Sequence, residues 1–341
     1  MRFVVAKDGS GDYTSLQAAV DALQEGNDQL SEILVRRGIY EERVVVHRSL
    51  VRIIGEDREE TVITGRACAK DRYPDGREKT TFLSATLMVT GRDVEVEHLT
   101  VRNDAGDGRV VGQAVAVYAA GDRGIWRDCH FAAHQDTLYC GPLRISDVVA
   151  DIGSRTGSAE QHPLVQDGPL TESRQYFENC LIEGDVDFIF GNYTCWFERC
   201  TLFMKERGGW YTAANTHPEQ SYGFVFHNCR LTGVCGIGKA FLGRPWRAGA
   251  RTVFLACEMD EHVAPEGFAD WDAGRKLTER CGEWGTTGAR ADQRTRHPAQ
   301  KRLTDAEAAG LTMFCVLGGK DHWQPERKFR EDEQIKGASK P

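Results

Sequence analysis

One short pattern recurs along the chain and limits the folds that it can adopt. An aromatic residue, two further residues, a cysteine, any residue and an apolar residue follow one another at 126–131 and 177–182, and close variants recur elsewhere. The aligned positions lie 30, 51, 20, 29 and 28 residues apart, at Leu99, Cys129, Cys180, Cys200, Cys229 and Cys257. Strands that repeat about every 20 to 30 residues are typical of a parallel β-helix, in which each coil buries its inward side chains on the next. We therefore predict a single-domain, all-β parallel β-helix, with unrelated strands of a β-sandwich as the alternative.

The strands that this fold requires are visible as short β-branched runs between glycines, without helical periodicity, at 33–35, 44–46, 51–55 and 61–65. Residues 66–80 are mostly polar and predict a loop. Before these runs, 15–23 predicts a short helix with Thr14 as N-cap and Gln17 as its capping-box partner. Such a helix could cover the open end of the sheet stack, which otherwise exposes unpaired backbone groups.

Net charge, apolar runs and cysteine positions bear on whether the protein binds nucleic acid, spans a membrane or is secreted. The formal net charge of -8 argues against a nucleic-acid-binding surface. Lys7 stands where a secretion signal would need its apolar core, and no apolar run approaches the roughly 20 residues of a membrane span. Five of the eleven cysteines share the repeat position, which favours reduced, buried side chains. We expect a cytoplasmic monomer, or a secreted protein if a leader has been removed.

Two aspartates keep the same distance from the cysteine of their repeat. Asp136 stands seven residues after Cys129, and Asp187 stands seven residues after Cys180 within an apolar run. If the two stretches are equivalent positions of neighbouring coils, their carboxyl groups would lie on adjacent strands about 4.8 Å apart. Because two such carboxyl groups do not ionise together easily, one would act as an acid and the other as a base or nucleophile. The alternative is a buried structural pair.

Further polar and aromatic residues suit ester hydrolysis. The side-chain amides of Gln113 and Gln135 could donate to a developing oxyanion, or belong to an amide ladder inside the coil. Arg244 could hold one carboxylate ionised and oriented, or form a structural salt bridge. Three aromatic residues could stack on a sugar ring or pack at the coil edge: Tyr139, Phe190 and Trp246.

The long interval and the C-terminus depart from the repeat. Part of 140–175 is expected to leave the coil as an inserted loop at the rim of the cleft, because it lies between the two aspartates and contains several glycines and prolines. Residues 304–309 predict a helix with Thr304 and Glu307 as a capping box. The domain is therefore expected to span 1–325, followed by a charged tail at 326–341.

Several blocks of this sequence resemble those of the pectin methylesterases. Residues 135–139, 186–192 and 242–246 are similar to the three signature blocks of that family. Weaker matches follow the same order, at 4–11, 38–42, 112–116 and 265–268, so that the resemblance covers about residues 3 to 323. It implies a right-handed parallel β-helix and a substrate that is a methyl-esterified galacturonan oligomer or polymer. No metal or organic cofactor is implied.

The resemblance also implies roles for matching residues. Asp187 would be the nucleophile on the methyl ester of a galacturonate residue, and Asp136 would be the general acid and then the general base. Gln113 and Gln135 would form the oxyanion hole, and Arg244 would pair with Asp187. Four residues would line the sugar sites: Tyr139, Val186, Phe190 and Trp246.

Two other functions remain open from the residues alone. A polygalacturonase-like glycosidase also uses paired carboxyl groups, although amides and an arginine serve an acyl centre better. A non-catalytic pectin-binding solenoid would need the aromatic residues but not the aspartates. Tyr193 and Phe268 depart from the family pattern, where a small residue and a tryptophan are frequent, and are expected to affect specificity.

Overall fold

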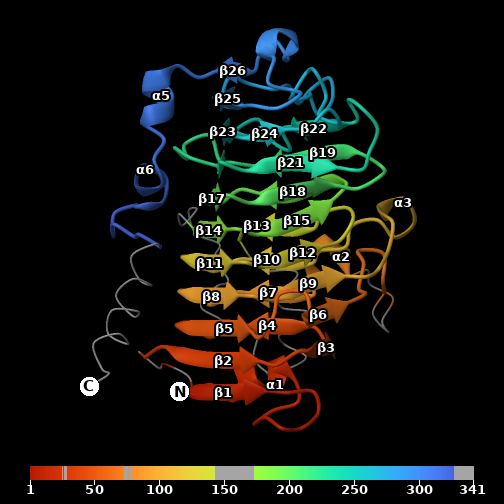
Figure 1. Cartoon of the computed structure of the whole chain (residues 1–341), viewed down its shortest axis with the longest axis vertical. Coiled ribbons are helices and arrows are strands. Elements are labelled where there is room, and N and C mark those ends of the chain that lie inside the picture. Colours follow the sequence, from red (N-terminus) through yellow and green to blue (C-terminus); the bar gives the residue numbers. More distant parts are fainter. Residues whose placement is uncertain (25, 27–28, 73–75, 77–78, 143–172, 326–341) are drawn as a thin grey trace.

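The strands of this chain wind into one continuous parallel stack. The computed structural model describes residues 1–24, 26, 29–72, 76, 79–142 and 173–325. Within these ranges the strands form three parallel sheets, which we name A, B and C, and the chain climbs from the N-terminus at one end of the stack to its last strand, at residues 301–302, at the other (Figure 1). The predicted parallel β-helix is therefore confirmed.

Between residues 31 and 243, each coil of the stack contributes one strand to each sheet in turn, and the coils at the two ends are incomplete. Sheet A is formed by β1 (Arg2–Val5), β2 (Ser31–Val35), β5 (Val51–Gly55), β8 (Val94–Glu97), β11 (Gly124–Arg127), β14 (Arg174–Glu178), β17 (Thr194–Glu198), β20 (Phe224–His227), β23 (Thr252–Leu255), β25 (Gly282–Trp284) and β26 (Lys301–Arg302). Sheet B is formed by β3 (Gly38–Glu41), β6 (Thr61–Gly65), β9 (Thr100–Asn103), β12 (His130–Ala132), β15 (Leu181–Gly184), β18 (Thr201–Met204), β21 (Arg230–Gly233) and β24 (Glu258–Met259). Sheet C is formed by β4 (Val44–Val46), β7 (Leu87–Val89), β10 (Val117–Ala119), β13 (Leu138–Cys140), β16 (Val186–Gly191), β19 (Gly209–Ala214) and β22 (Ala240–Gly243).

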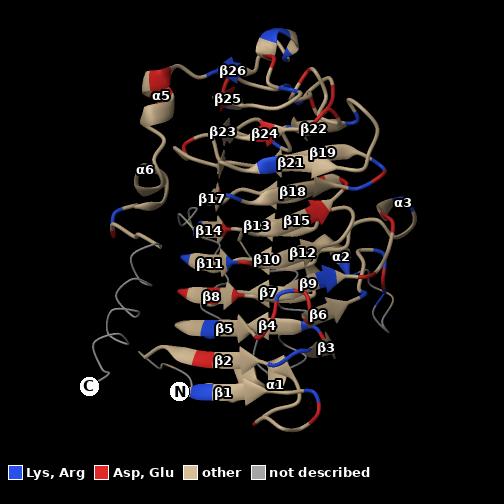
Figure 2. Ribbon diagram, in the orientation of Figure 1, with Lys and Arg blue, Asp and Glu red and all other residues tan. Residues whose placement is uncertain are grey.

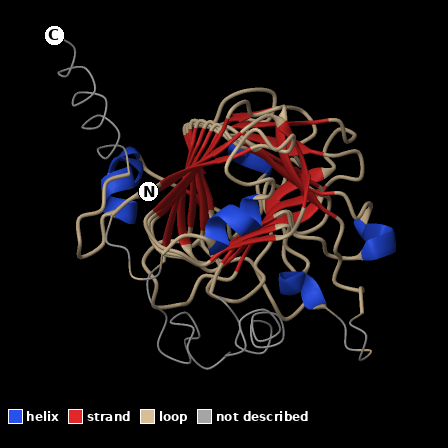
Figure 3. Ribbon diagram, turned by 90° about the horizontal axis from the view of Figure 1, so that it is seen from below, coloured by secondary structure: helices blue, strands red, loops and turns tan. Residues whose placement is uncertain are grey.

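The helices are short and lie at the ends or on the outside of the stack. They are α1 (Leu16–Asp21), α2 (Thr80–Leu83), α3 (Gly108–Val111), the 3-10 turn η2 (Gln293–Thr295), α5 (Asp305–Ala309) and α6 (Met313–Leu317). Viewed along the stack, the strands surround an interior that the main hydrophobic core fills (Figure 3). No helix in the described part of the chain is long and apolar enough to cross a membrane.

The repeated pattern corresponds to the turn between sheets A and B. The residue before each aligned position has a left-handed backbone, with φ of 53° at His98, 49° at Asp128 and 52° at Asn179. This conformation turns the chain sharply, so that the next side chain points into the coil. The aligned leucine and five cysteines are all 0 or 1% exposed. All eleven cysteines are free and ten are buried, as predicted for the repeat cysteines.

The aromatic position of the pattern builds a second internal column. Trp126 and Phe177 stack at 5.9 Å, and Phe177 stacks on Phe197 at 4.5 Å. The column continues to Phe226 at 4.4 Å and from there to Phe254 at 4.6 Å. Each of these rings stands three residues before a repeat cysteine. Because the rings of successive coils stack face to face, the aromatic and cysteine positions of one coil align with those of the next.

The N-terminal end is closed by α1, but its capping differs from the prediction. Ser15, rather than Thr14, is the N-cap and accepts a hydrogen bond from the Ala18 N–H. Gln17 is not its capping-box partner, because its side chain bonds to the backbone of Val45 instead. The first backbone N–H groups of the helix donate to the carboxylate of Glu42 at 2.8 and 3.0 Å. The predicted helix is confirmed, and a residue far along the chain completes its cap.

The C-terminal region runs along the outside of sheet A (Figure 1). Thr304 and Glu307 form the predicted capping box at α5. Leu317 and Trp323 pack against an outer cluster that includes Tyr176 and Trp196. The predicted insertion at 140–175 is bounded by Cys140 in β13 and by β14, and its residues 143–172 lie outside the described chain, as does the predicted tail at 326–341.

The outer face of sheet A carries alternating charges. Successive strands bear red and blue segments in Figure 2, from β2 through β5 and β8 to β11. Arg52 lies 3.6 Å from Glu32 on one side and 3.1 Å from Glu97 on the other. Arg127 lies 3.0 Å from Glu95 and 2.8 Å from Glu178. Each arginine is thus paired with carboxylates on both neighbouring coils.

Candidate active site

Asp136 and Asp187 lie where the chain turns from sheet B to sheet C. The pairing of β12 with β15 aligns His130 with Leu181, and the pairing of β13 with β16 aligns Leu138 with Ile189. In both pairings the partners are as far apart in sequence as Asp136 is from Asp187, so the two aspartates occupy equivalent positions on neighbouring coils. The Asp136 N–H donates to the Val186 carbonyl at 3.1 Å. The predicted placement of the two residues on neighbouring coils is therefore confirmed.

The backbone at both aspartates is unusual. Asp136 has a φ of 67° and Asp187 a φ of 52°, in the left-handed region that costs a non-glycine residue roughly 1–2 kcal/mol. The register between β16 and β19 shifts between Val186 and Ile189, so Asp187 lies in a bulge. A bulge redirects a side chain that would otherwise follow the alternation of the strand. The sequence contains no signal for this feature.

Arg244 follows β22 directly and clamps Asp187. Its Nε donates to Asp187 Oδ1 at 2.9 Å, and its Nη2 donates to Asp187 Oδ2 at 2.7 Å. Both side chains are well covered, at 17% and 7% exposed. The guanidinium also lies 3.7 Å from the centre of the Trp210 ring and 4.0 Å from that of Trp271. These two indoles, which the sequence analysis missed, hold the arginine between them.

The two carboxyl groups differ in their affinity for a proton. Burial raises the pKa of Asp136 well above its usual range, the charge of Asp187 raises it further, and Arg244 only partly opposes this. Burial also raises the pKa of Asp187, but two hydrogen bonds from Arg244 oppose this effect directly. Asp136 is therefore the better proton carrier and Asp187 the better anion.

Gln113 and Gln135 lie in the loops between sheets B and C, on coils next to each other. The Ala114 N–H donates to the Gln135 carbonyl at 3.2 Å, and the Gln113 carbonyl accepts from Ala69 at 2.8 Å. Both glutamines are partly exposed, so neither belongs to an amide ladder inside the coil. Neither side-chain amide bonds to another described residue, which leaves its N–H groups available to a ligand.

The predicted aromatic residues form a row on the outer face of sheet C. Tyr139 lies 4.7 Å from Phe190, and Phe190 lies 6.0 Å from Trp246. However, Tyr139 is 3% exposed and Phe190 4%, and Val186 is buried as well. Of these four predicted residues, Trp246 alone is partly exposed. The expectation that Tyr139 and Phe190 offer open stacking faces is therefore not met in this conformation, in which they pack on each other.

Tyr193 and Phe268, the two departures from the family pattern, are core residues. Phe268 is 1% exposed and packs on Phe254 at 6.0 Å. The hydroxyl of Tyr193 donates to the Ala120 carbonyl at 2.8 Å inside the stack. Both side chains are enclosed, so any effect on specificity would be indirect, and that expectation stays a prediction.

Two charged residues beside the aspartates were also missed. His134 and Asp185 stand five residues after Cys129 and Cys180, and a hydrogen bond of 3.0 Å joins Nδ1 of His134 to Oδ2 of Asp185. The same cysteine landmark that identified the aspartates would have found them.

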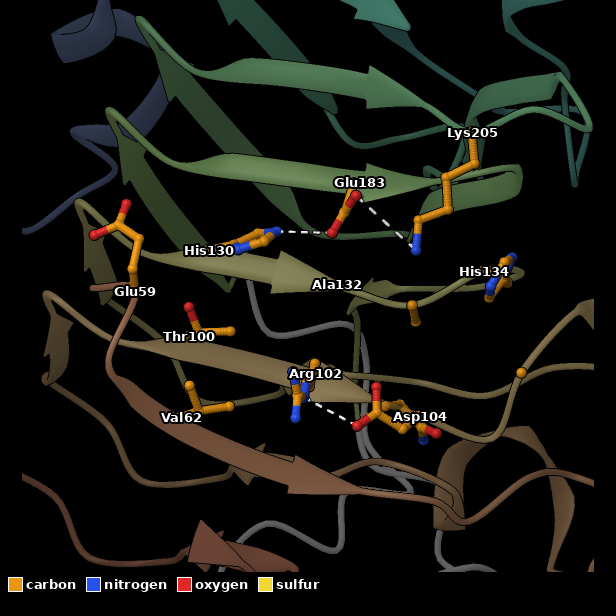
Figure 4. Close-up of a pocket in the computed structure, with 13 residues that line it drawn as sticks. Glu59, Val62, Thr100, Arg102, Asp104, His130, Ala132, His134, Glu183 and Lys205 are labelled. Carbon is orange, nitrogen blue, oxygen red and sulfur yellow. Dashed lines mark hydrogen bonds and ion pairs between the residues drawn. The ribbon is translucent and has the colours of Figure 1, made fainter. Parts of the chain in front are cut away.

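A separate polar cavity of about 460 Å³ opens on the outer face of sheet B (Figure 4). Its charged side chains mostly pair with one another, as His130 does with Glu183 and Arg102 with Asp104. Among the residues that the structure describes, no cluster of His, Cys, Asp and Glu could hold a metal ion.

Several known proteins are similar to this chain in sequence and in fold. The profile of the family described as Pectinesterase matches residues 2–145 and 165–320. The chain is 35% identical over 334 residues to a probable pectinesterase/pectinesterase inhibitor 6 of Arabidopsis thaliana, covering 94% of this chain and 52% of the relative. It is 31% identical to pectinesterase 31 of Arabidopsis thaliana, covering 89% of this chain and 88% of the relative. The chain thus spans about half the length of the first of these relatives and most of the second.

Solved structures agree with these matches. The pectin methylesterase from carrot superposes with a TM-score of 0.76 at 29% identity, covering 96% of each chain. A pectin methylesterase in complex with a hexasaccharide superposes with a TM-score of 0.75 at 28% identity, covering 94% of this chain and 97% of the other. The family profile leaves 146–164 unmatched, within the predicted insertion. Taken with the three parallel sheets, the matches show that this chain belongs to the pectinesterase family.

Proposed function

We propose that this protein removes methyl esters from galacturonate residues of pectin or pectic oligosaccharides and releases methanol. One observation carries this proposal: Arg244 binds both oxygens of Asp187 beside a second carboxyl group, Asp136, that retains its proton more strongly. An oriented anion next to a neutral acid is what attack on an ester and protonation of its leaving group require.

The first half of the reaction assigns one role to each aspartate. An oxygen of Asp187 attacks the ester carbonyl carbon, and the carbonyl oxygen becomes an oxyanion that Gln113 and Gln135 stabilise by donating side-chain N–H groups. Collapse of this intermediate breaks the bond to the methoxy group, which takes the proton of Asp136 and leaves as methanol. An acyl-enzyme anhydride between Asp187 and the galacturonate remains.

The second half uses the same groups in reverse. Asp136, now ionised, removes a proton from a water molecule as it attacks the acyl carbon. The new tetrahedral intermediate expels the carboxylate of Asp187, which Arg244 stabilises as it regains its charge. The galacturonate acid is released, and Asp136 is protonated again for the next turnover.

The substrate is proposed to be an oligomer or polymer that lies along the outer face of sheet C. Two solved relatives are pectin methylesterases in complex with hexasaccharides. Val186, Tyr139, Phe190 and Trp246 border the aspartates on that face and would line the sugar sites. Because Tyr139 and Phe190 are nearly enclosed, Trp246 is the first aromatic surface that a sugar ring would meet.

The site of action and the assembly state stay predictions from the sequence. The relatives give no support to a cytoplasmic setting, and the free cysteines are the main argument for a reducing compartment. Light scattering on the purified protein would test the predicted monomer.

The proposal is tested by measuring methanol and new reducing ends in the same sample. We expect methanol release from methylated oligogalacturonides of graded length and from polymeric pectin, without new reducing ends. New reducing ends would instead indicate a glycosidase, and binding without either product would indicate a non-catalytic solenoid.

A further inference from the structure

A second pair of side chains spans the same two coils as the aspartates. His134 Nδ1 lies 3.0 Å from Asp185 Oδ2. The two residues have the same sequence offset as Asp136 and Asp187 and stand two positions before them. The reaction proposed above uses neither side chain.

The carboxylate of Asp185 is 1% exposed, so its charge must be compensated within the protein. Its Oδ1 accepts a hydrogen bond from the Val186 N–H at 2.7 Å and lies 3.9 Å from Nη1 of Arg207. Its backbone N–H donates to the His134 carbonyl at 3.0 Å, and its carbonyl accepts from Trp210 at 3.2 Å. Through these bonds, Asp185 connects the coil of Asp136, its own coil and β19, one residue before Val186.

The charge of Asp185 also acts on the proposed acid. Besides burial and the charge of Asp187, Asp185 raises the pKa of Asp136. Within the described chain, the charged groups that interact with His134 or Asp185 include Asp107 and Arg109 at α3, Glu183 on β15 and Arg207 after β18.

We propose that His134 and Asp185 are positioning residues of the esterase: their hydrogen-bonded side chains fix the corner that presents both aspartates and hold the carboxyl group of Asp185 near Asp136. This inference rests on the function proposed above. It does not require either residue to touch the substrate.

The chain offers a matched control on the same two strands. His130 bonds to Glu183 at 2.9 Å between β12 and β15, which makes it the same kind of histidine–carboxyl contact. Figure 4 shows this pair at the centre of the sheet B cavity, with His134 apart from it at one end. His130 stands six residues before Asp136, whereas His134 stands two residues before it.

The first test compares the pH dependence of methanol release in Asp185→Asn and Glu183→Gln. Asn keeps the shape of Asp185 but removes its charge, so Asp136 should lose its proton at lower pH. We expect the alkaline limb of kcat to move to lower pH, which reduces the rate there by about three- to tenfold, with KM unchanged. Glu183→Gln should leave the profile in place. An unmoved limb in Asp185→Asn, or an equal shift in Glu183→Gln, would overturn the inference.

A second variant covers the case in which Asp185→Asn does not fold. His134→Ala removes the partner at a half-exposed position and should lower kcat about tenfold with little change in KM, because the corner loosens. His134→Gln can still donate to Asp185 and should restore most of the rate, while His130→Ala should remain near wild type. Equal rates for His134→Ala and His130→Ala would contradict the proposed positioning.

A measurement without turnover separates this inference from the proposed function. The carboxyl ¹³C signal of Asp136, assigned with Asp136→Asn, should titrate at lower pH in Asp185→Asn than in wild type. Failure of wild type to release methanol would remove the esterase function alone. An Asp136 titration that is unchanged by Asp185→Asn would remove the inference about His134 and Asp185.

Discussion

Two buried carboxyl pairs in this molecule share their chemistry but differ in their backbone. Glu95 and Glu97 lie on the regular strand β8, on the outer face of sheet A. Burial and the hydrogen bond with Glu97 raise the pKa of Glu95 to about 9, whereas the hydrogen bond from Glu95 and the charge of Arg52 outweigh burial and lower the pKa of Glu97. One partner thus keeps a proton and the other ionises, as we infer for the two aspartates.

The difference lies in how each pair is held. Arg52 and Arg127 pair the glutamates with the coils on both sides, which ties the face of a flat sheet together. Asp136 and Asp187 have left-handed backbones at a corner, and Arg244 bonds to Asp187 but not to Asp136. Two neighbouring carboxyl groups with different pKa values therefore do not by themselves identify an active site. Strained backbone and one-sided pairing distinguish the pair to which we assign chemistry.

The largest expected effect comes from Asp187→Ala. Loss of the nucleophile should reduce methanol release by about a thousandfold or more while oligogalacturonide binding persists. Glu97→Gln, at the comparable position of the other pair, should leave the rate within about twofold of wild type. Steady-state methanol assays check both variants, and an active Asp187→Ala enzyme would mean that the two pairs have been assigned the wrong way.

Asp136→Asn should reduce the rate by about 10² to 10⁴-fold, because the leaving methoxide would lack its proton donor. Single-turnover methanol release measures this step without interference from product release. The matched Glu95→Gln variant should turn over normally. Near-normal release by Asp136→Asn would show that another group supplies the proton.

Arg244→Lys should lower kcat by about ten- to a hundredfold, since lysine cannot bond to both oxygens of Asp187 or fill the space between Trp210 and Trp271. Arg52→Lys at the structural pair is expected to change kcat little. The rates of the two purified variants provide the comparison, and equal losses would make Arg244 a structural residue.

The smallest effect on the methanol-release rate is expected at Glu95, where the change concerns stability instead. Because its pKa is raised from 4.5 to about 9 on folding, the folded state retains a proton that the unfolded chain releases between these values. The stability of wild type should therefore fall as pH rises through this window, whereas Glu95→Gln removes the effect. Thermal unfolding of wild type and Glu95→Gln at pH 5 and pH 8 checks this. The Tm of the variant should rise relative to that of wild type from pH 5 to pH 8, and an unchanged difference between the two Tm values would argue against the raised pKa.

The sequence predicted the parts of the molecule that depend on register. The cysteine intervals placed Asp136 opposite Asp187, because each coil repeats the same inward positions. Strands such as β4 and β5 and the capping box at Thr304 follow from local patterns that the structure reproduces.

Features that need several distant segments could not be predicted. The bulge at Asp187 depends on how β16 meets β19, and the indoles around Arg244 come from a strand and a loop without any motif. The capping-box prediction at Gln17 failed for a related reason, since the carboxylate of Glu42, from a later segment, accepts the first N–H groups of the helix. Local patterns therefore gave the candidate aspartates but not the surroundings that distinguish them from Glu95 and Glu97.

The division of labour between Asp136 and Asp187 is tested most directly by the carboxyl ¹³C titration of both residues in the wild-type protein. Our account predicts that Asp187 ionises at lower pH than Asp136, so that a range exists in which the first is an anion and the second a neutral acid. The opposite order, or two residues that titrate together at the ordinary pH of an aspartate, would contradict it.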